Sequence, residues 1–474
     1  MLTAPARLGA VVVIQVATVD QLQDSVVQTW IGSLFAGERG AECQVVPGNC
    51  LVSMAGCIRE TDAVPRVTCE EGAMGRASRR VVILLAAGGL AAGLGGMAAS
   101  GAAAAVPATG RASAAVTSSS SPSFNELYGV SAVSGSNAWA VGRQNSTGVF
   151  KTLILHWNGA AWSTVKSPSP SSSDAELFGV SAVSGSDAWA VGWYWNGPAR
   201  AYDTLILHWN GTAWAQVHSP NPSPGNNYLF GVSARSGSDA WAVGNYDSNT
   251  LTVHWNGTAW TQVKTPSLGP GVYGGLNGVS AVSGSDAWAV GSHSIPSDGG
   301  RSGTLIFHWD GMAWSTVNSP SPGSGLNGLA GVSARSGSDA WAVGDDGSSL
   351  NPGTSRTLVL HWNGTAWSKI NSPTPNPNDL NFLEGVSARS GSDAWAAGRY
   401  WNTTGVARSL ILHWNGTAWS KINSPNPSPT ATELYEVSAV SGSDAWAVGF
   451  YDTAVSNTLI LHWNGTAWAK ALAG

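Results

Sequence analysis

Residues 177–192 read LFGVSAVSGSDAWAVG, and residues 204–214 read TLILHWNGTAW. Each phrase recurs seven times, in the same order, between about residue 125 and the C-terminus. The tryptophan of the first phrase returns at intervals of 50, 52, 47, 53, 54 and 51 residues. Its seven copies are Trp139, Trp189, Trp241, Trp288, Trp341, Trp395 and Trp446. Repetition at this period indicates a ring or solenoid built from one repeated unit.

Each repeat divides into four short strands. The first, LxGVSAV, ends at a Ser-Gly-Ser-Asp cluster that suits a tight turn. The second, AWAVG, precedes a loop of variable length. The third, TLILHW, is followed by Asn-Gly, which predicts a two-residue hairpin into the fourth strand, AWSKV. A proline-rich connector ends each repeat, because proline cannot serve in a central ladder.

The strands are apolar on both faces, as in Leu153-Ile154-Leu155, so both faces of each sheet are expected to be buried. Seven such four-stranded sheets predict an all-β, seven-bladed β-propeller. The end repeats look like the middle ones, whereas a solenoid needs distinct caps. The seventh repeat completes its fourth strand near Lys470. We therefore expect the ring to close by packing of the first blade on the last, without strand exchange.

The residues before the repeats predict export. Residues 74–108 have a basic start, an apolar stretch and a tail of small residues, which is the layout of a cleavable signal peptide. The pair Arg79-Arg80 also resembles a twin-arginine signal, so the export route stays open. Residues 1–73 are interpreted as a doubtful extension, with translation starting at Met74. Residues 109–124 are expected to be a flexible linker, and residues 125–474 the propeller of a secreted protein without a remaining membrane span.

The composition of the chain argues against several classes of partner. Only 11% of the 474 residues are charged and the net charge is −5, so there is no electrostatic reason to bind nucleic acid. The four cysteines (Cys43, Cys50, Cys57 and Cys69) precede the repeats, contain no CxxC and are expected to lack structural partners. No metal, no cofactor and a monomeric state are expected.

The repeated aromatic and polar residues have structural explanations. Three tryptophans per repeat in seven repeats account for 21 of the 25, and we expect them to hold neighbouring blades together. The seven HW histidines are expected roughly 10 Å apart, too far to share a metal ion, and therefore to form hydrogen bonds within their blades. The turn aspartates are expected to accept local backbone bonds, with a repeated calcium site as the alternative. The five Asn-Gly-Thr triplets match glycosylation acceptors, but turn chemistry explains them better.

This pattern of AWAVG-like and ILHW-like strands closing in Gly-x-Trp resembles the sialidase-like and photosystem-assembly-factor propellers. It is more similar still to the tryptophan-rich propellers of secreted bacterial proteins. The resemblance covers about residues 127 to 470 and implies the fold. HWNGTAW lacks the aspartate of the sialidase Asp-box, and Arg235, Arg335 and Arg389 lie beside the Ser-Gly-Ser-Asp turns rather than on a ligand face. Sialidase chemistry is therefore disfavoured.

The seven copies differ mainly in the loops between second and third strands and between blades, which lie at one end of a propeller. We expect constant turns at one end and recognition at the other. Aromatic residues beside Asn or Asp in these variable segments suit the faces and edges of sugar rings. The candidate ligand-binding residues are Trp193, Tyr194, Trp195, Asn196, Tyr246, Asp247, Tyr400, Trp401, Asn402, Tyr451 and Asp452.

Three kinds of function fit this pattern, since propellers host all of them. The favoured one is a non-catalytic binding module for a glycan or a partner protein. A hydrolase or lyase with one asymmetric site is the alternative, and its candidate residues are His293, Asp345, Asp346, Asp203 and Glu384. No nucleophile–base pair supports them, so no catalytic residue is predicted. The third is a structural protein of the cell surface.

Overall fold

The computed structural model describes residues 41–46, 49–54, 124–145, 148–170, 172–296, 301–348 and 353–471. The chain divides into two compact units, Met1–Ala115 and Val116–Gly474. In the first unit the described residues form one antiparallel hairpin of β1 (Ala41–Val46) and β2 (Asn49–Met54). The predicted signal peptide at 74–108 lies outside the described residues, as does most of the predicted linker.

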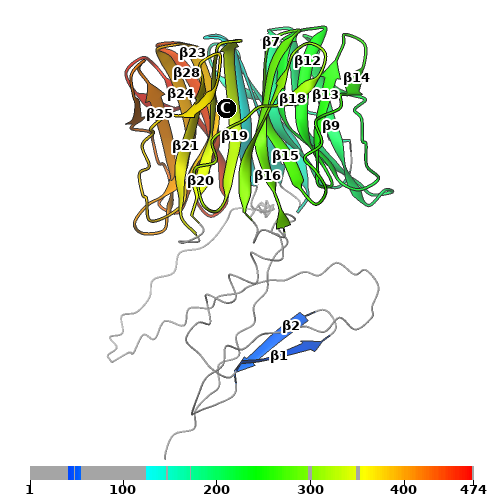
Figure 1. Ribbon diagram of the computed structural model, residues 1–474, viewed down its shortest axis with the longest axis vertical. Helices are drawn as coiled ribbons and strands as arrows, with labels where there is room; N and C mark the ends of the chain where they lie inside the picture. Colours follow the sequence, from blue (N-terminus) through cyan, green and yellow to red (C-terminus); the bar gives the residue numbers. More distant parts are fainter. Residues whose placement is uncertain are drawn as a thin grey trace, which may run out of the picture. The chain divides into compact units, whose positions relative to one another are not determined.

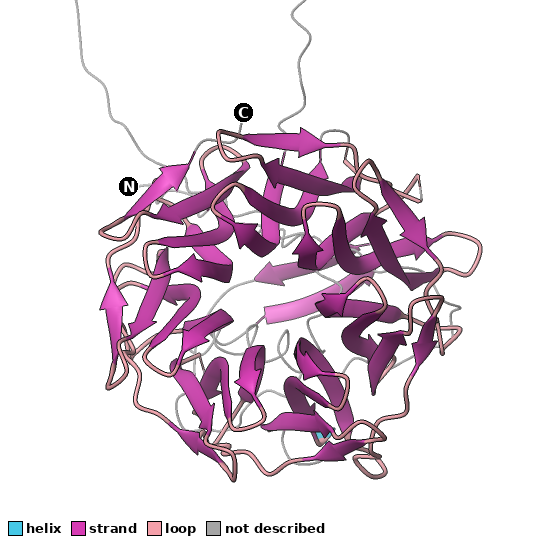
Figure 2. Cartoon of the chain, turned by 90° about the horizontal axis from the view of Figure 1, so that it is seen from above, coloured by secondary structure: helices cyan, strands magenta, loops and turns pink. Residues whose placement is uncertain are grey.

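The second unit is a ring of seven four-stranded antiparallel sheets (Figures 1 and 2), which confirms the predicted seven-bladed propeller. Blades one to three are β3 (Phe124–Ser134), β4 (Asn137–Asn145), β5 (Phe150–Trp157), β6 (Trp162–Val165); β7 (Ala175–Ser184), β8 (Asp187–Asn196), β9 (Ala201–Trp209), β10 (Trp214–Val217); β11 (Asn227–Ser236), β12 (Asp239–Tyr246), β13 (Asn249–Trp255) and β14 (Trp260–Gln262). Blades four and five are β15 (Tyr273–Ser283), β16 (Asp286–Ser294), β17 (Ser302–Trp309), β18 (Trp314–Thr316); β19 (Asn327–Ser336), β20 (Asp339–Gly347), β21 (Ser355–Trp362) and β22 (Trp367–Lys369). Blades six and seven are β23 (Asn381–Ser390), β24 (Asp393–Trp401), β25 (Ala407–Trp414), β26 (Trp419–Ile422); β27 (Thr432–Ser441), β28 (Asp444–Asp452), β29 (Ser456–Trp463) and β30 (Trp468–Ala471).

Chain order within a blade is also spatial order, from the axis outward. The first strand of each blade lies beside the first strands of both neighbours, around the centre of the ring (Figure 2). The turn from first to second strand is tight, as predicted, with Ser184 paired to Asp187. The predicted two-residue Asn-Gly turn is wrong, because four residues separate the paired Trp209 and Trp214. Asn210 Oδ1 accepts the amides of the third and fourth residues of this loop, which favours the turn explanation for the Asn-Gly-Thr triplets.

Tryptophans fill the seams between blades, as expected. Trp139 of blade one is fully buried and packs on blade two, with ring centroids 4.9 Å from Trp209 and 5.1 Å from Trp214. The same arrangement recurs at every seam. Burying one indole removes about 200 Å² of surface from water, worth ~5 kcal/mol gross. These apolar seams are therefore the main source of cohesion between blades.

The ring closes through one more seam of this kind. Trp446 of blade seven packs on blade one, 5.0 Å from Trp157 and 5.2 Å from Trp162. All four strands of blade seven come from the last repeat, and all four strands of blade one from the first. The predicted closure without strand exchange is confirmed.

The repeated histidines form hydrogen bonds inside their own blades. His208 Nε2 lies 2.8 Å from Asp187 Oδ1, and the same pair recurs at 2.9–3.0 Å in blades three to seven. In blade one, Asn137 replaces the aspartate and lies 3.3 Å from His156. The turn aspartates were expected to accept local backbone amides, and the structure instead pairs each of them with the histidine of its own blade. Among the residues that the structure describes, no group of three or more His, Cys, Asp or Glu side chains could hold a metal ion.

None of the described residues belongs to a helix long and apolar enough to cross a membrane.

Candidate functional site

Four of the predicted ligand-binding aromatics pack between blades. Strand β8 runs on to Asn196, so these side chains lie on extended second strands rather than in loops. Tyr194 packs against the seam formed by Trp139 and Leu177, and its hydroxyl points to Asp203. The equivalent residues of blades three, six and seven pack on their own seams; they are Tyr246, Tyr400 and Tyr451. Their position explains them as part of the packing.

The polar residues predicted beside these aromatics organise turns. Asn196 Nδ2 donates to Asp203 Oδ2 at 2.7 Å. Asn402 Oδ1 accepts the amides of Thr404 and Val406, both at 3.0 Å. In the other two blades, Ser223 donates to Asp247 and Ser456 donates to Asp452. Each of these side chains already has a hydrogen-bond partner within the propeller.

The three predicted tryptophans point to the opposite side of their strands, because side chains alternate along a strand. Trp193 and Trp195 lie 4.6 and 5.0 Å from the ring of Tyr202, so the structure brings these two together. Trp401, four blades further on, belongs to a separate group with Phe382 and Arg399. Of the predicted set, these tryptophans are the ones that remain available for a ligand.

The first strands contain the position that sequence reasoning missed. In each blade the ladder between first and second strands slips by one residue directly after the conserved leucine, for example between Leu127 and Gly129. The extra residue is a β-bulge, which re-aims its side chain. Seven bulged residues therefore surround the axis: Tyr128, Phe178, Phe230, Asn277, Ala330, Glu384 and Tyr435. They differ strongly, although the VSA segment that follows one residue later is the same in every blade.

The bulged residues divide the axis into two arcs. Tyr128 stacks on Phe178 with centroids 5.0 Å apart and meets Tyr435 edge-on at 5.2 Å. Phe178 in turn meets Phe230 at 5.4 Å, which completes an aromatic arc over blades seven, one, two and three. Blades four to six supply the small and polar side chains of the other arc.

A second divergent position lies next to the bulges, directly after the glycine that ends AWAVG. Its seven residues are Arg143, Trp193, Asn245, Ser292, Asp345, Arg399 and Phe450. We call these residues and the seven bulged residues together the axial mouth. It lies toward the end of the ring that carries the loops between second and third strands.

Two arginines of the axial mouth tie neighbouring blades together. Arg143 lies 2.7 Å from Glu126 of its own blade and 2.9 Å from Glu176 of blade two. Arg399 lies 2.9 Å from Glu384 and 3.3 Å from Glu433 of blade seven. Each guanidinium also faces an aromatic ring of the arc: Arg143 lies 5.6 Å from the centre of Tyr128, and Arg399 lies 5.1 Å from that of Tyr435.

Two other carboxyl groups near the axis lack an ion pair among the described residues. Burial, with Glu384 and Asp346 nearby, raises the pKa of Asp345 to about 8 despite the opposing effect of Arg399. Burial also raises the pKa of Glu436 to about 8; a hydrogen bond from the amide of Val437 opposes this rise, and Glu384 adds to it.

Glu436 occupies the position of the glycine in the LxGVS phrase of the other six repeats. This departure from the repeated phrase was the signal in the sequence that could have identified Glu436.

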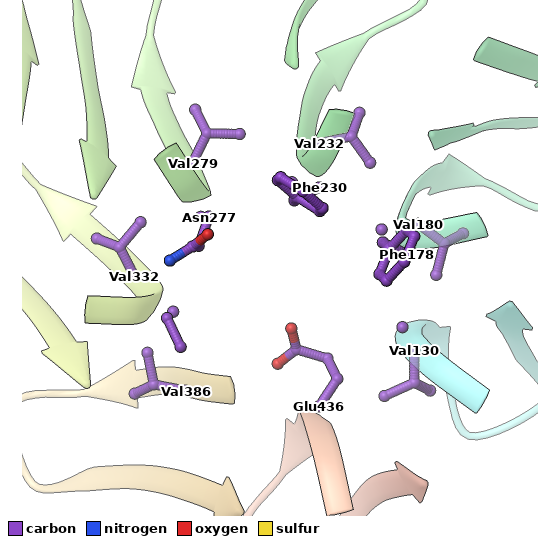
Figure 3. A pocket seen from close by; sticks show the side chains of 16 residues that line it. Val130, Phe178, Val180, Phe230, Val232, Asn277, Val279, Val332, Val386 and Glu436 are labelled. Atoms are coloured by element: carbon purple, nitrogen blue, oxygen red, sulfur yellow. The ribbon is translucent and has the colours of Figure 1, made fainter. Parts of the chain in front are cut away.

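Glu436 points into a small cavity on the axis (Figure 3). The cavity measures about 90 Å³, and its side-chain lining includes Phe178, Phe230 and Asn277, together with a ring of valines. Pockets for whole small-molecule ligands typically measure ~300–1,000 Å³. The cavity is therefore smaller than a pocket for a whole ligand.

The residues considered for catalysis are dispersed. Asp203 binds Asn196, Asp346 pairs with Lys369 at 2.5 Å, and His293 lies against Gly303. Asp345 and Glu384 do lie together at the axial mouth, where Glu384 raises the pKa of Asp345. Asp346, the next residue on β20, also raises that pKa, whereas Asp203 and His293 are not among the groups that act on Asp345.

No family model and no curated protein matches the chain. Among solved structures it is similar to YCF48 from Cyanidioschyzon merolae, at 14% identity and a TM-score of 0.46, over 72% of this chain and 96% of that one. It is also similar to a PL25 ulvan lyase bound to a GlcA–Rha3S saccharide, at 8% identity and 0.47, over 71% and 92%. A third is the SapL1 lectin in complex with α-methyl fucoside, at 13% identity and 0.39, over 61% and 93%. These similarities concern the fold alone; the seven-bladed β-propeller architecture of this chain comes from its own seven four-stranded sheets.

Proposed function

We propose that this protein is a non-catalytic binding propeller that takes a glycan across its axial mouth. The observation that carries the proposal is the position of the differences between the seven repeats. The VSA and AWAVG segments are nearly identical in all blades, whereas the start of the first strand, the bulge and the residues after the second-strand glycine diverge. The bulge and the residue directly after that glycine meet at the axis. A scaffold role alone gives no reason for symmetry to break there.

The chemistry of the axial mouth supports a sugar ligand. Aromatic rings offer flat apolar faces with polar groups at their edges, which complement the faces and hydroxyl rims of sugar rings. Two arginine–glutamate networks, one beside Tyr128 and one beside Tyr435, provide fixed donors and acceptors. The small cavity below limits entry to one substituent, so a chain-like ligand lying on the mouth fits better than a compact one inside it.

The test is retention of the full chain on a panel of insoluble polysaccharides. Phe178→Ala and Phe230→Ala together remove part of the aromatic arc, and Ala330 shows that the bulge accepts alanine. Trp195→Ala with Trp401→Ala probes the outer tryptophans instead. Met312→Ala, on an exposed turn, is the matched control. We expect retention that the bulge variant loses and the control keeps.

Each other result changes the proposal. Loss only in the tryptophan variant would move the site outward to the strand ends. No retention on any polysaccharide would overturn the glycan ligand and favour a partner protein at the same mouth.

Asp345 and Glu384 favour a second candidate, a glycan-cleaving enzyme. The carboxyl of Asp345, with a pKa of about 8, is mostly protonated at neutral pH and can act as a general acid beside Glu384, which pairs with Arg399. The measurement is release of new sugar ends from any glycan that the protein retains. Cleavage that disappears in Asp345→Asn would establish the enzyme, and intact glycan would leave the binding function.

We also propose that the protein is secreted as a monomer after cleavage near residue 108. The basic, apolar and small-residue order of residues 74–108 supports export. Intact mass and N-terminal sequencing of protein from the culture medium test this, together with light scattering for the oligomeric state. Peptides from before Met74 would contradict the proposed start site.

A further inference from the structure

The axial cavity presents hydrogen-bond acceptors from its side chains. Figure 3 shows the Glu436 carboxylate pointing into its centre, across from Phe230 and Asn277. Asn277 Nδ2 donates to the carbonyl of Leu329 at 2.9 Å, and this bond turns Oδ1 toward the cavity. A carboxylate and an amide oxygen both require a donor.

The aromatic lining adds a preference for positive charge. Phe178 and Phe230 line the same cavity, and aromatic faces attract cations. The axial mouth already contains two examples of this chemistry, because Arg143 and Arg399 each lie over a ring and between two glutamates. Among the described residues, no lysine, arginine or histidine forms an ion pair with Glu436.

We propose that the axial cavity binds a primary ammonium group of the ligand, held by Glu436 and Asn277 against Phe178 and Phe230. An ammonium has three donors and no acceptor, which matches this lining. A cavity of about 90 Å³ is well below the ~300–1,000 Å³ of pockets that take whole ligands, so it suits a small head group. The inference rests on the proposed function, since it makes the bound glycan an amino sugar.

Glu436 is also in a position to couple binding to proton release. Its carboxyl has a pKa of about 8, so the protonated form predominates at pH 7. An ammonium favours the ionised form, and binding at pH 7 therefore releases protons. Glu384 on β23 acts in the opposite sense to the ligand, and Arg399 pairs with that carboxylate. Tyr128 on β3 and Tyr435 on β27 stay neutral, because burial raises the pKa of each.

The direct test is calorimetric titration of the full chain with n-butylammonium at pH 7, with n-butanol as the uncharged ligand of the same size. Glu436→Gly is the matched variant, because the other six blades have glycine at this position; Glu436→Gln keeps the shape and removes the charge. We expect saturable binding, with proton release measured by comparing buffers of different ionisation enthalpy. Both variants should weaken binding at least tenfold and abolish the proton release. Equal binding of butanol, or unchanged binding by the variants, would overturn the inference.

Oligosaccharides separate this inference from the function on which it rests. Glucosamine oligomers should bind more tightly than N-acetylglucosamine oligomers, and Glu436→Gly should remove the difference. If both oligomers bind equally in protein and variant, the glycan function stands and the ammonium site is wrong. If butylammonium and a lysine-rich peptide bind but no sugar does, the ammonium site stands and its ligand is a protein. If nothing binds, both proposals fall.

Discussion

Truncating Trp446 to alanine tests whether the ring is closed in solution. Trp446 is 1% exposed and contributes blade seven's indole to the seam with blade one. Trp241, also 1% exposed, occupies the same place between blades three and four, 4.9 Å from Trp309 and 5.0 Å from Trp314. The two substitutions therefore remove the same contacts, one at the closing seam and one inside the chain of blades.

Removal of a buried tryptophan usually costs about 3–5 kcal/mol, combining lost burial of ~200 Å² with the cavity that remains. We expect ~4 kcal/mol for Trp446→Ala and the same value, within ~0.5 kcal/mol, for Trp241→Ala, because a closed ring makes the two seams equivalent. The assay is urea unfolding followed by far-ultraviolet circular dichroism and by the remaining tryptophan fluorescence, with Trp446→Phe as a milder comparison. A cost below ~1 kcal/mol at Trp446 alone would refute closure by packing, since an open seam already exposes that indole.

Three further predictions concern the blades themselves. Gly291→Ala should lower the thermal unfolding temperature strongly, because the new Cβ would lie 2.0 Å from the carbonyl oxygen of Gly275. Gly284→Ala is the control and should change that temperature little, because no atom lies within 4 Å of its Cβ position. Equal effects of the two substitutions would contradict the close approach of Gly291 to Gly275. Burial alone would raise the pKa of Asp239, but hydrogen bonds from His254 and Arg235 lower it below 3.8. A carboxyl whose pKa is lowered by folding stabilises the protein above its unfolded pKa, and this stabilisation disappears as the pH falls through the folded pKa. Wild type should therefore lose more stability than Asp239→Asn when the pH falls below ~4, as measured by the midpoints of urea unfolding. Burial lowers the pKa of His156 in wild type, and Asn137→Asp should raise it by placing a carboxylate beside the ring. Proton NMR titration measures this pKa, and an unchanged value in the variant would show that the new His–Asp pair does not form.

The repeated phrases were enough to predict the blades, because the local signals and the period agree in every copy. The seams followed from strands that are apolar on both faces. Hydrogen bonding of His208 and its equivalents within their blades was also predicted, but their aspartate partners were not, because those aspartates were expected to accept backbone amides. The third-to-fourth turn was mispredicted because Asn-Gly is typical of both two-residue and longer hairpin loops. The asparagine here accepts two amides across a four-residue loop.

The candidate site was harder to predict. Taking the second strand to end at AWAVG placed Trp193, Tyr194 and Trp195 in a loop, where all three could face a ligand. The strand in fact continues, and alternation sends Tyr194 into a seam. The bulge was invisible for another reason: a one-residue slip between paired strands leaves no mark in a single strand's pattern. Glu436 was visible as the one departure from glycine, but its meaning depended on knowing that the first strand lines the axis.

The bulge also suggests how a ring of duplicated repeats can evolve a binding site. Seven copies of one repeat start with the same first strand around the axis. Nearly every substitution of a paired residue in these strands disturbs either strand pairing or the packing between blades. A bulged residue has no paired residue on the neighbouring strand, so single mutations there leave strand pairing intact. Drift at seven such points, fixed on a circle around one axis, can turn a symmetric assembly into an asymmetric receptor while every blade keeps its shape.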